Sequence, residues 1–166
     1  MQDYHWNNFT KRVTVKAPVF SLYAAWATKT GLESWFLSEA IVTKADGTLR
    51  EADEYFEAGD SFEWRWQGYD DSTVDRGHII SANGIDQLSF TFSGKNILTV
   101  NFPIESGEII CSIEQQMQQD TEAEKRYFYI ECGLGWTFYL ANLKSVFEGG
   151  NDLRNKNVAI QKLINA

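Results

Sequence analysis

The amino-acid sequence predicts an α+β fold in which a curved antiparallel sheet of six to seven strands wraps around one long C-terminal α-helix. Two observations predict it. Between residues 9 and 117, short alternations of apolar and polar residues are separated by turn residues, as in antiparallel strands. From residue 121 to 147 the apolar period lengthens to that of a helix. No linker or repeat interrupts the sequence, so we expect one domain over 1–166, with a core at about 9–148 and a tail at 149–166.

The chain opens with a half-buried strand and two short helices. Phe9, Val13 and Val15 alternate with polar residues, which predicts a strand with one apolar face. Pro18 then begins a first short helix, because its missing N–H is not needed in the first helical turn. After Gly31, the segment LESWF is expected to form a second short helix.

The remaining strands are expected to follow one another as a meander, in which strands adjacent in sequence are adjacent in the sheet. A turn is predicted at 68–72, and Asn83–Gly84 is a strong hairpin signal. The expected strands are AIVTK at 40–44, SFEWRWQ at 61–67, TVDRGHII at 73–80, QLSFTF at 87–92, ILTVNF at 97–102 and EIICSIEQQM at 108–117.

A long helix is predicted from about residue 122 to 148. Thr121 and Glu124 form a capping box at its start, and Gly149–Gly150 ends it. A helix this long must cover the apolar face of the sheet, and a cleft remains where the two do not touch. In the tail, the segment at 157–164 is compatible with one or two further helical turns. The apolar residues at helical spacing are Tyr129, Cys132, Trp136, Leu140, Leu143 and Phe147.

Composition excludes several classes of protein. The net charge is −8 and the pI near 4.7, which argues against nucleic-acid binding and against anionic membranes. No apolar run is long enough to span a membrane, and the N-terminus lacks the apolar region of a signal peptide, so we expect a cytoplasmic protein. Cys111 and Cys132 are expected to be buried free thiols.

Four segments resemble the family named after the activator of Hsp90 ATPase homologue 1, within the helix-grip (START-like) superfamily. Their order and spacing carry the resemblance. The chain departs from the family pattern at Ala58–Gly59, where a Gly-Gly pair is common, and at Asn83–Gly84, where many members have Pro. The segments are VTVKAPVFSLYAAWATKTGLESWF, FEAGDSFEWRW, RGHIISANGIDQLSFTF and GWTFYLANLKSVFE.

The resemblance implies three functions. The first is non-catalytic binding of a small hydrophobic or amphipathic ligand in a cavity between the sheet and the C-terminal helix, without a cofactor. The second is a co-chaperone-like interaction module with a chaperone as partner and a role in the stress response. The third is a cyclase- or hydratase-like enzyme, which would need at least two polar groups converging in the cavity. The superfamily is compatible with a monomer or a homodimer.

The aromatic face of the segment at 61–67 is the main candidate for a pocket wall. Phe62, Trp64 and Trp66 lie on one face of this strand. If the following hairpin closes symmetrically, Trp64 faces Arg76 and Phe62 faces His78. Arg76 would then bind an anionic group and His78 would offer a hydrogen bond or a proton. In the other interpretation the rings are a packed core, with Arg76 lying over Trp64.

Two glycines inside the long helix point to the same region. Gly133 and Gly135 each cost about 1 kcal/mol relative to Ala, so either the helix packs very closely there or a ligand needs the room. The acidic residues at 51–60 lack the spacing of a calcium loop and are expected to form a solvated loop. No zinc signature occurs, so no metal is expected. The expected ligand-binding residues are Trp35, Phe62, Trp64, Trp66, Arg76, His78, Tyr129, Trp136 and Tyr139, with no catalytic residue.

Overall fold

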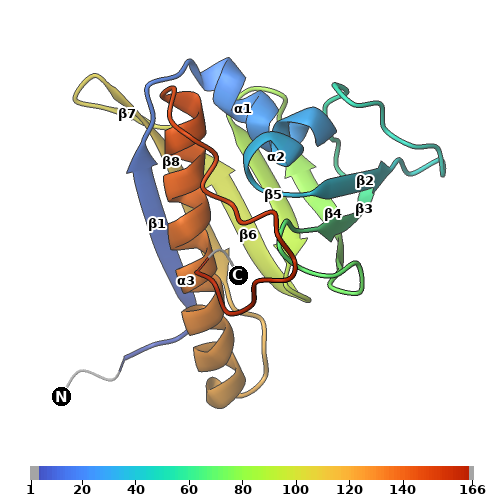
Figure 1. The fold of residues 1–166 in the computed structure, drawn as a ribbon, viewed down its shortest axis with the longest axis vertical. Coiled ribbons are helices and arrows are strands. Elements are labelled where there is room, and N and C mark those ends of the chain that lie inside the picture. Colours follow the sequence, from blue (N-terminus) through green and yellow to red (C-terminus); the bar gives the residue numbers. More distant parts are fainter. Residues whose placement is uncertain (1–3, 165–166) are drawn as a thin grey trace.

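The computed structural model describes residues 4–164 and consists of a curved antiparallel sheet, two short helices and one long helix (Figure 1). The elements in order are β1 (Asn8–Thr14), α1 (Val19–Ala27), α2 (Lys29–Trp35), β2 (Glu39–Thr43), β3 (Ser61–Arg65), β4 (Asp75–Ala82), β5 (Gln87–Phe92), β6 (Asn96–Asn101), β7 (Ile104–Glu105), β8 (Glu108–Gln116) and α3 (Glu122–Phe147).

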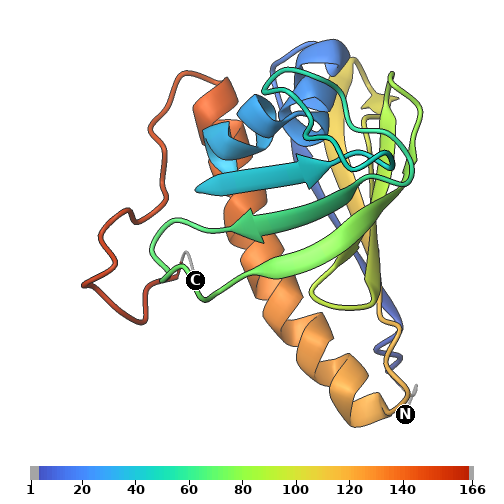
Figure 2. The same ribbon diagram turned by 90° about the vertical axis from the view of Figure 1, so that its right-hand side faces the viewer.

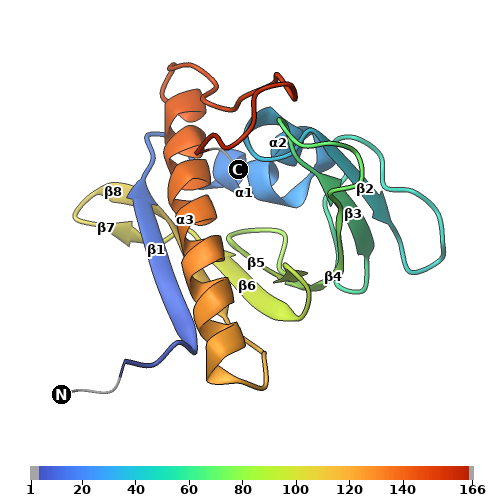
Figure 3. The same cartoon turned by 60° about the horizontal axis from the view of Figure 1, so that its bottom comes forward.

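The sheet has the strand order β1-β8-β6-β5-β4-β3-β2, with β7 paired to β8 outside this path. Its strands curl from β1 to β2 around α3, as Figures 2 and 3 show from two sides. Helix α3 packs on β1 and α2, while α1 and α2 close one end of the sheet. The predicted helix-grip architecture is confirmed, and the two-residue strand β7 is the one strand that the sequence pattern did not indicate.

Helix α3 is continuous through Gly133 and Gly135, as predicted. The Thr121 hydroxyl accepts a hydrogen bond from the Glu124 backbone N–H at 3.2 Å, so the predicted N-terminal cap is present. The helix ends at Phe147, and the following Gly149 adopts a left-handed conformation with φ of 81°.

Aromatic rings from the short helices and α3 form the centre of the core. Trp26 stacks on Trp136 with ring centroids 5.6 Å apart, and Trp35 packs against both Trp26 and Phe36. The indole N–H of Trp136 donates to the buried Gln115 side chain at 2.8 Å, which satisfies both buried polar groups. These contacts fix the position of α3 relative to the sheet.

The acid-rich loop between β2 and β3 is held by a buried arginine. The Arg50 guanidinium donates two hydrogen bonds to Asp60, at 2.6 and 2.9 Å, and one each to Glu54 and Glu57. A solvated loop was expected for this segment. Instead, three of its acidic residues surround one cation, and Arg50 and Asp60 are both buried.

The C-terminal segment forms turns where one or two helical turns were possible. Arg154 is buried and donates to the carbonyl oxygens of Glu33, Ser34 and Leu37 at the end of α2. This charge–dipole contact fastens the segment to the core. Beyond Arg154, Asn155 and residues 160–163 line a small hollow together with Gly68 and Tyr69 of the loop between β3 and β4.

The register between β3 and β4 differs by one residue from a symmetric hairpin. Phe62 pairs with Gly77 and Trp64 with Asp75, so Gly77 and Asp75 share the inner face with the two rings. A Cβ atom on Gly77 would lie 2.6 Å from Cζ of Phe62 and 2.1 Å from Oγ1 of Thr91. Glycine therefore lets β4 pass close beneath the Phe62 ring.

We predict that Gly77→Ala destabilises the protein by about 1–3 kcal/mol, because the added methyl group overpacks a site bounded by Phe62 and Thr91. The neighbouring variant His78→Ala, on the exposed outer face, is the matched control and should stay within about 0.5 kcal/mol of wild type. Urea unfolding of the three proteins measures this difference. Equal midpoints for Gly77→Ala and wild type would contradict the close approach.

Candidate functional site

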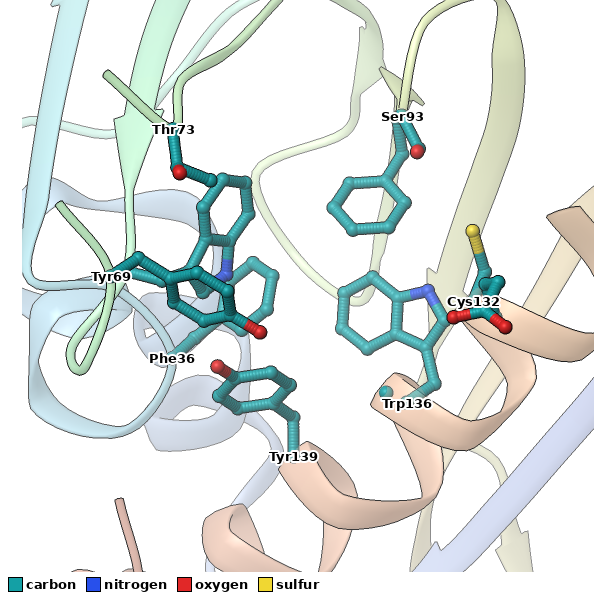
Figure 4. A pocket seen from close by; sticks show the side chains of 11 residues that line it. Phe36, Tyr69, Thr73, Ser93, Cys132, Trp136 and Tyr139 are labelled. Atoms are coloured by element: carbon teal, nitrogen blue, oxygen red, sulfur yellow. The ribbon is translucent and has the colours of Figure 1, made fainter. Parts of the chain in front are cut away.

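A cavity of about 260 Å³ lies between α3, the loop from β3 to β4 and the turn after β5 (Figure 4). We refer to it as the aromatic cavity. Six of its lining residues carry rings. The lining residues are Phe36, Trp66, Tyr69, Thr73, Phe92, Ser93, Glu131, Cys132, Gly135, Trp136 and Tyr139.

The walls are rings that also belong to the core. Phe36 stacks on Trp136 with centroids 4.9 Å apart, and Tyr139 meets the edge of Phe36 at the same distance. Phe92 packs on Trp136 at 4.8 Å, and Trp66 lies edge-on to Phe36 at 5.8 Å. Because these rings pack on one another, the apolar walls are formed before any ligand arrives.

Two tyrosines mark one side of the aromatic cavity. The hydroxyl groups of Tyr69 and Tyr139 point toward one another in Figure 4. Tyr139 comes from α3, whereas Tyr69 comes from the loop after β3. Burial raises the pKa of both phenols above the ordinary value, so both carry their protons at neutral pH. Each can donate a hydrogen bond.

The opposite side carries Ser93 and Cys132, as Figure 4 shows. Burial raises the pKa of the Cys132 thiol, and the negative charges of Asp75 and Glu131 raise it further, while hydrogen bonds from Gln115 and Ser93 lower it. The net direction is upward, so Cys132 is a neutral thiol and a poor nucleophile at neutral pH.

Asp75 lies in an adjoining hollow that shares four residues with the aromatic cavity. Its carboxylate accepts a hydrogen bond from the backbone N–H of Ser93 at 2.8 Å. Burial raises the pKa of Asp75, and bonds from backbone N–H groups offset only part of that effect. The adjoining hollow is lined by Trp66, Thr73, Val74, Asp75, Phe92, Ser93, Gly94 and Phe128.

Gly135 opens the helix side of the aromatic cavity. A Cβ atom added at Gly135 would meet no heavy atom within 4 Å, and one added at Gly133 would meet only Cε of Lys11, at 3.9 Å. Neither glycine is therefore required by close packing. Of the two explanations considered for these glycines, room beside the helix fits Gly135, since it lines the cavity.

The structure brings three of the nine expected ligand-binding residues to this cavity, namely Trp66, Trp136 and Tyr139. Three more are buried in the core without lining it: Trp35, Phe62 and Trp64. Tyr129 packs against Phe9 and Trp6 beside β1. Contact of any of these residues with a ligand remains a prediction.

The expectation that Arg76 and His78 face the inside is wrong. Because the β3–β4 register is shifted by one residue, both side chains point outward, and Asp75 takes the inner position expected for Arg76. The Arg76 side chain is 65% exposed and pairs with Glu63 at 3.3 Å. The cavity therefore has a carboxylate near its end where a guanidinium was expected.

Some lining residues had a signal in the sequence and others had none. Gly135 drew attention because glycine destabilises the interior of a helix, and Phe92 belongs to a strand with alternating apolar residues. Tyr69 lies in an irregular loop, where no periodicity indicates the direction of a side chain. Thr73 was expected to begin a strand but lies in the same loop, since β4 starts at Asp75. Within residues 4–164, no cluster of three or more His, Cys, Asp or Glu is suited to a metal ion. No helix in that range is long and apolar enough to cross a membrane.

No family model matches the chain, and no curated protein matches its sequence. Solved structures do match its fold. The protein SSP2350 from Staphylococcus saprophyticus has 17% identity and a TM-score of 0.68, over 89% of this chain and 96% of that one. The Aha1 dimer from Colwellia psychrerythraea has 15% identity and a TM-score of 0.64, over 87% and 98%.

A third similar structure is DynU16, a protein of the dynemicin biosynthetic locus. It has 15% identity and a TM-score of 0.66, over 90% of this chain and 50% of DynU16. At identities this low, the likeness establishes the helix-grip fold, and function has to be argued from the site.

We predict that Asp75→Asn raises the stability of the protein at neutral pH. An acid whose pKa is raised on folding loses folding free energy when it ionises, and this loss is absent below the pKa of the unfolded Asp, about 3.9. Asn keeps an acceptor for the Ser93 N–H and removes the charge. Urea unfolding should therefore find the variant more stable at about pH 7 and equal to wild type near about pH 3.

Asp71→Asn, in the exposed loop before β4, is the control for a change of charge alone and should stay within about 0.5 kcal/mol of wild type. A wild type that is more stable than Asp75→Asn at neutral pH would contradict the prediction.

Proposed function

We propose that the protein binds a small apolar or amphipathic molecule in the aromatic cavity between the sheet and α3. One observation carries this proposal: six rings surround about 260 Å³ that the protein's own side chains do not fill. Packed interiors hold few voids larger than a water molecule, whereas ligand pockets usually measure roughly 300–1,000 Å³. The volume of the aromatic cavity lies just below this range, which suits a small molecule.

The polar groups around the cavity favour binding over a reaction. The raised pKa values of Tyr69, Tyr139 and Cys132 keep their protons in place at neutral pH. A general base works best with a pKa near the operating pH, and a nucleophile needs its deprotonated form. These three groups instead serve as hydrogen-bond donors that orient a ligand. A cyclase- or hydratase-like activity remains the third interpretation.

Family resemblance adds support of a weaker kind. The sequence segments similar to the activator of Hsp90 ATPase homologue 1 family agree with an Aha1 dimer among the similar structures. DynU16, with the same fold, belongs to a biosynthetic locus, which suits a fold that handles small molecules. Membership of the Aha1-like family is accordingly part of the proposal, as is a cytoplasmic location.

A second function, association with a protein partner, is favoured by the outer face of α3. Tyr127, Ile130 and Leu134 follow one another at helical spacing, and their side chains are exposed. An apolar stripe on an otherwise acidic surface is typical of an interaction site. A second copy of the chain is the simplest occupant, by analogy with the Aha1 dimer. A chaperone is the other partner that the resemblance suggests.

We predict that side-chain size at position 135 controls ligand binding. Gly135→Ala should raise the free energy of unfolding by about 1 kcal/mol, because Ala favours the helix and its methyl group meets no neighbour. Gly135→Leu should also fold, but its side chain should occupy the cavity and abolish binding of naphthylethanol, a neutral aromatic probe. Calorimetric titration of wild type and both variants measures this. If Gly135→Leu bound naphthylethanol as tightly as wild type, the binding site would have to lie outside the aromatic cavity.

We predict that Leu134→Glu removes any self-association of the protein. The substitution puts a charge at the C-terminal end of the apolar stripe, one helical turn from Ile130, and leaves the cavity side of α3 unchanged. Sedimentation velocity should give a dimer for wild type and a monomer for the variant, with the same affinity for naphthylethanol. Glu108→Gln, an exposed change on β8, should sediment like wild type. A monomeric wild type would exclude the second copy as occupant.

A further inference from the structure

The charged groups at the aromatic cavity all have the same sign. Glu131 lines the cavity itself, and Asp75 lines the adjoining hollow. Among the described residues, no Lys, Arg or His lines either space. The cavity and the adjoining hollow are neighbours, since four residues line both of them: Trp66, Thr73, Phe92 and Ser93.

Neither carboxylate has a cation to pair with in the part of the chain that the structure describes. Asp75 accepts hydrogen bonds from backbone N–H groups, including that of Ser93, and no ion pair involves Asp75 or Glu131 between residues 4 and 164. Arg76, which follows Asp75 on β4, pairs instead with Glu63 on the outer face. Two negative charges therefore lie at the same end of the cavity uncompensated.

The carboxylates of Asp75 and Glu131 both act electrostatically on Cys132. Each of them contributes to the raised pKa of the Cys132 thiol, which lines the cavity from α3. Asp75 comes from β4 and Glu131 from α3, so they approach this point from different elements. A positively charged group placed beside Cys132 would interact with both carboxylates at once, with the half-buried Asp75 and with Glu131 at the exposed surface.

The rings near this end add a second source of attraction. Trp66 and Phe92 line both the cavity and the adjoining hollow, and Trp136 packs on Phe92 with centroids 4.8 Å apart. Aromatic faces are electron-rich and bind cations, with Trp the most effective. Apolar walls alone would accept any molecule of suitable size. Aromatic walls together with two unpaired carboxylates instead discriminate by charge.

We propose that the natural ligand carries a protonated amine or a quaternary ammonium group on an apolar body, with the cationic group held among Trp66, Phe92, Asp75 and Glu131. This inference rests on the proposed ligand-binding function and specifies its chemical class. The hydroxyl groups of Tyr69 and Tyr139, on the opposite side of the cavity, then face the apolar body or a polar group at its far end.

Three probes with the same ring and different charge test this: naphthylethylamine, which is cationic at neutral pH, naphthylethanol, which is neutral, and naphthylacetate, which is anionic. Calorimetric titration of the full chain at low ionic strength should give naphthylethylamine the lowest Kd, at least about fivefold below that of naphthylethanol, with naphthylacetate weakest. Added salt should weaken the binding of naphthylethylamine and leave the binding of naphthylethanol unchanged.

Two isosteric variants locate the charge effect. Glu131→Gln and Asp75→Asn should each raise the Kd of naphthylethylamine relative to that of naphthylethanol, and so reduce the preference for the cation. Glu108→Gln, a carboxylate on β8 that lines neither space, should retain the full preference.

The outcomes separate this inference from the function on which it rests. Naphthylacetate binding as tightly as naphthylethylamine, or a preference unaffected by both cavity variants, would overturn the charge assignment and leave ligand binding intact. Failure of naphthylethanol and of both other probes to bind would overturn the proposed function together with the inference.

Discussion

The close approach of Gly77 to Phe62 determines which side chains of β4 reach the interior. A side chain at position 77 would overlap the Phe62 ring and Thr91, so glycine is needed where β4 passes beneath that ring. Since side chains alternate along a strand, this pairing also directs Asp75 inward and Arg76 outward. The negative charge of Asp75 beside the cavity is therefore a consequence of the uncharged contact between Gly77 and Phe62.

Periodicity revealed the elements of this fold because it is a local property. The alternating strands, the Pro18 start of α1, and a long helix capped by Thr121 all depend on residues within a few positions of one another. Strand register depends on the connecting loop. The loop between β3 and β4 does not close symmetrically, and the resulting shift of one residue reversed the predicted direction of Arg76 and His78.

Contacts that no local sequence pattern indicates explain the rest of what the sequence could not reveal. Arg50 and Asp60 are ten residues apart in a loop whose composition indicated solvent exposure, yet they form a buried pair. Tyr69 lines the cavity from an irregular loop. By contrast, the unfavourable Gly135 in a helix was informative, because a residue that weakens local structure requires a reason outside it.

The aromatic cavity combines a rigid side and an adaptable side. Trp136 and Phe36 are held by the core, since Trp136 stacks on Trp26 and donates to Gln115, and Phe36 stacks on Trp35. Their positions require no ordering when a ligand binds, which lowers the entropic cost of binding. Tyr69, in contrast, belongs to the loop between β3 and β4 and lines a small hollow together with Asn155 and residues 160–163 of the C-terminal segment. For the proposed ligand, selection by shape is therefore expected of the helix side and access of the loop side, because surface loops move more readily than packed core residues.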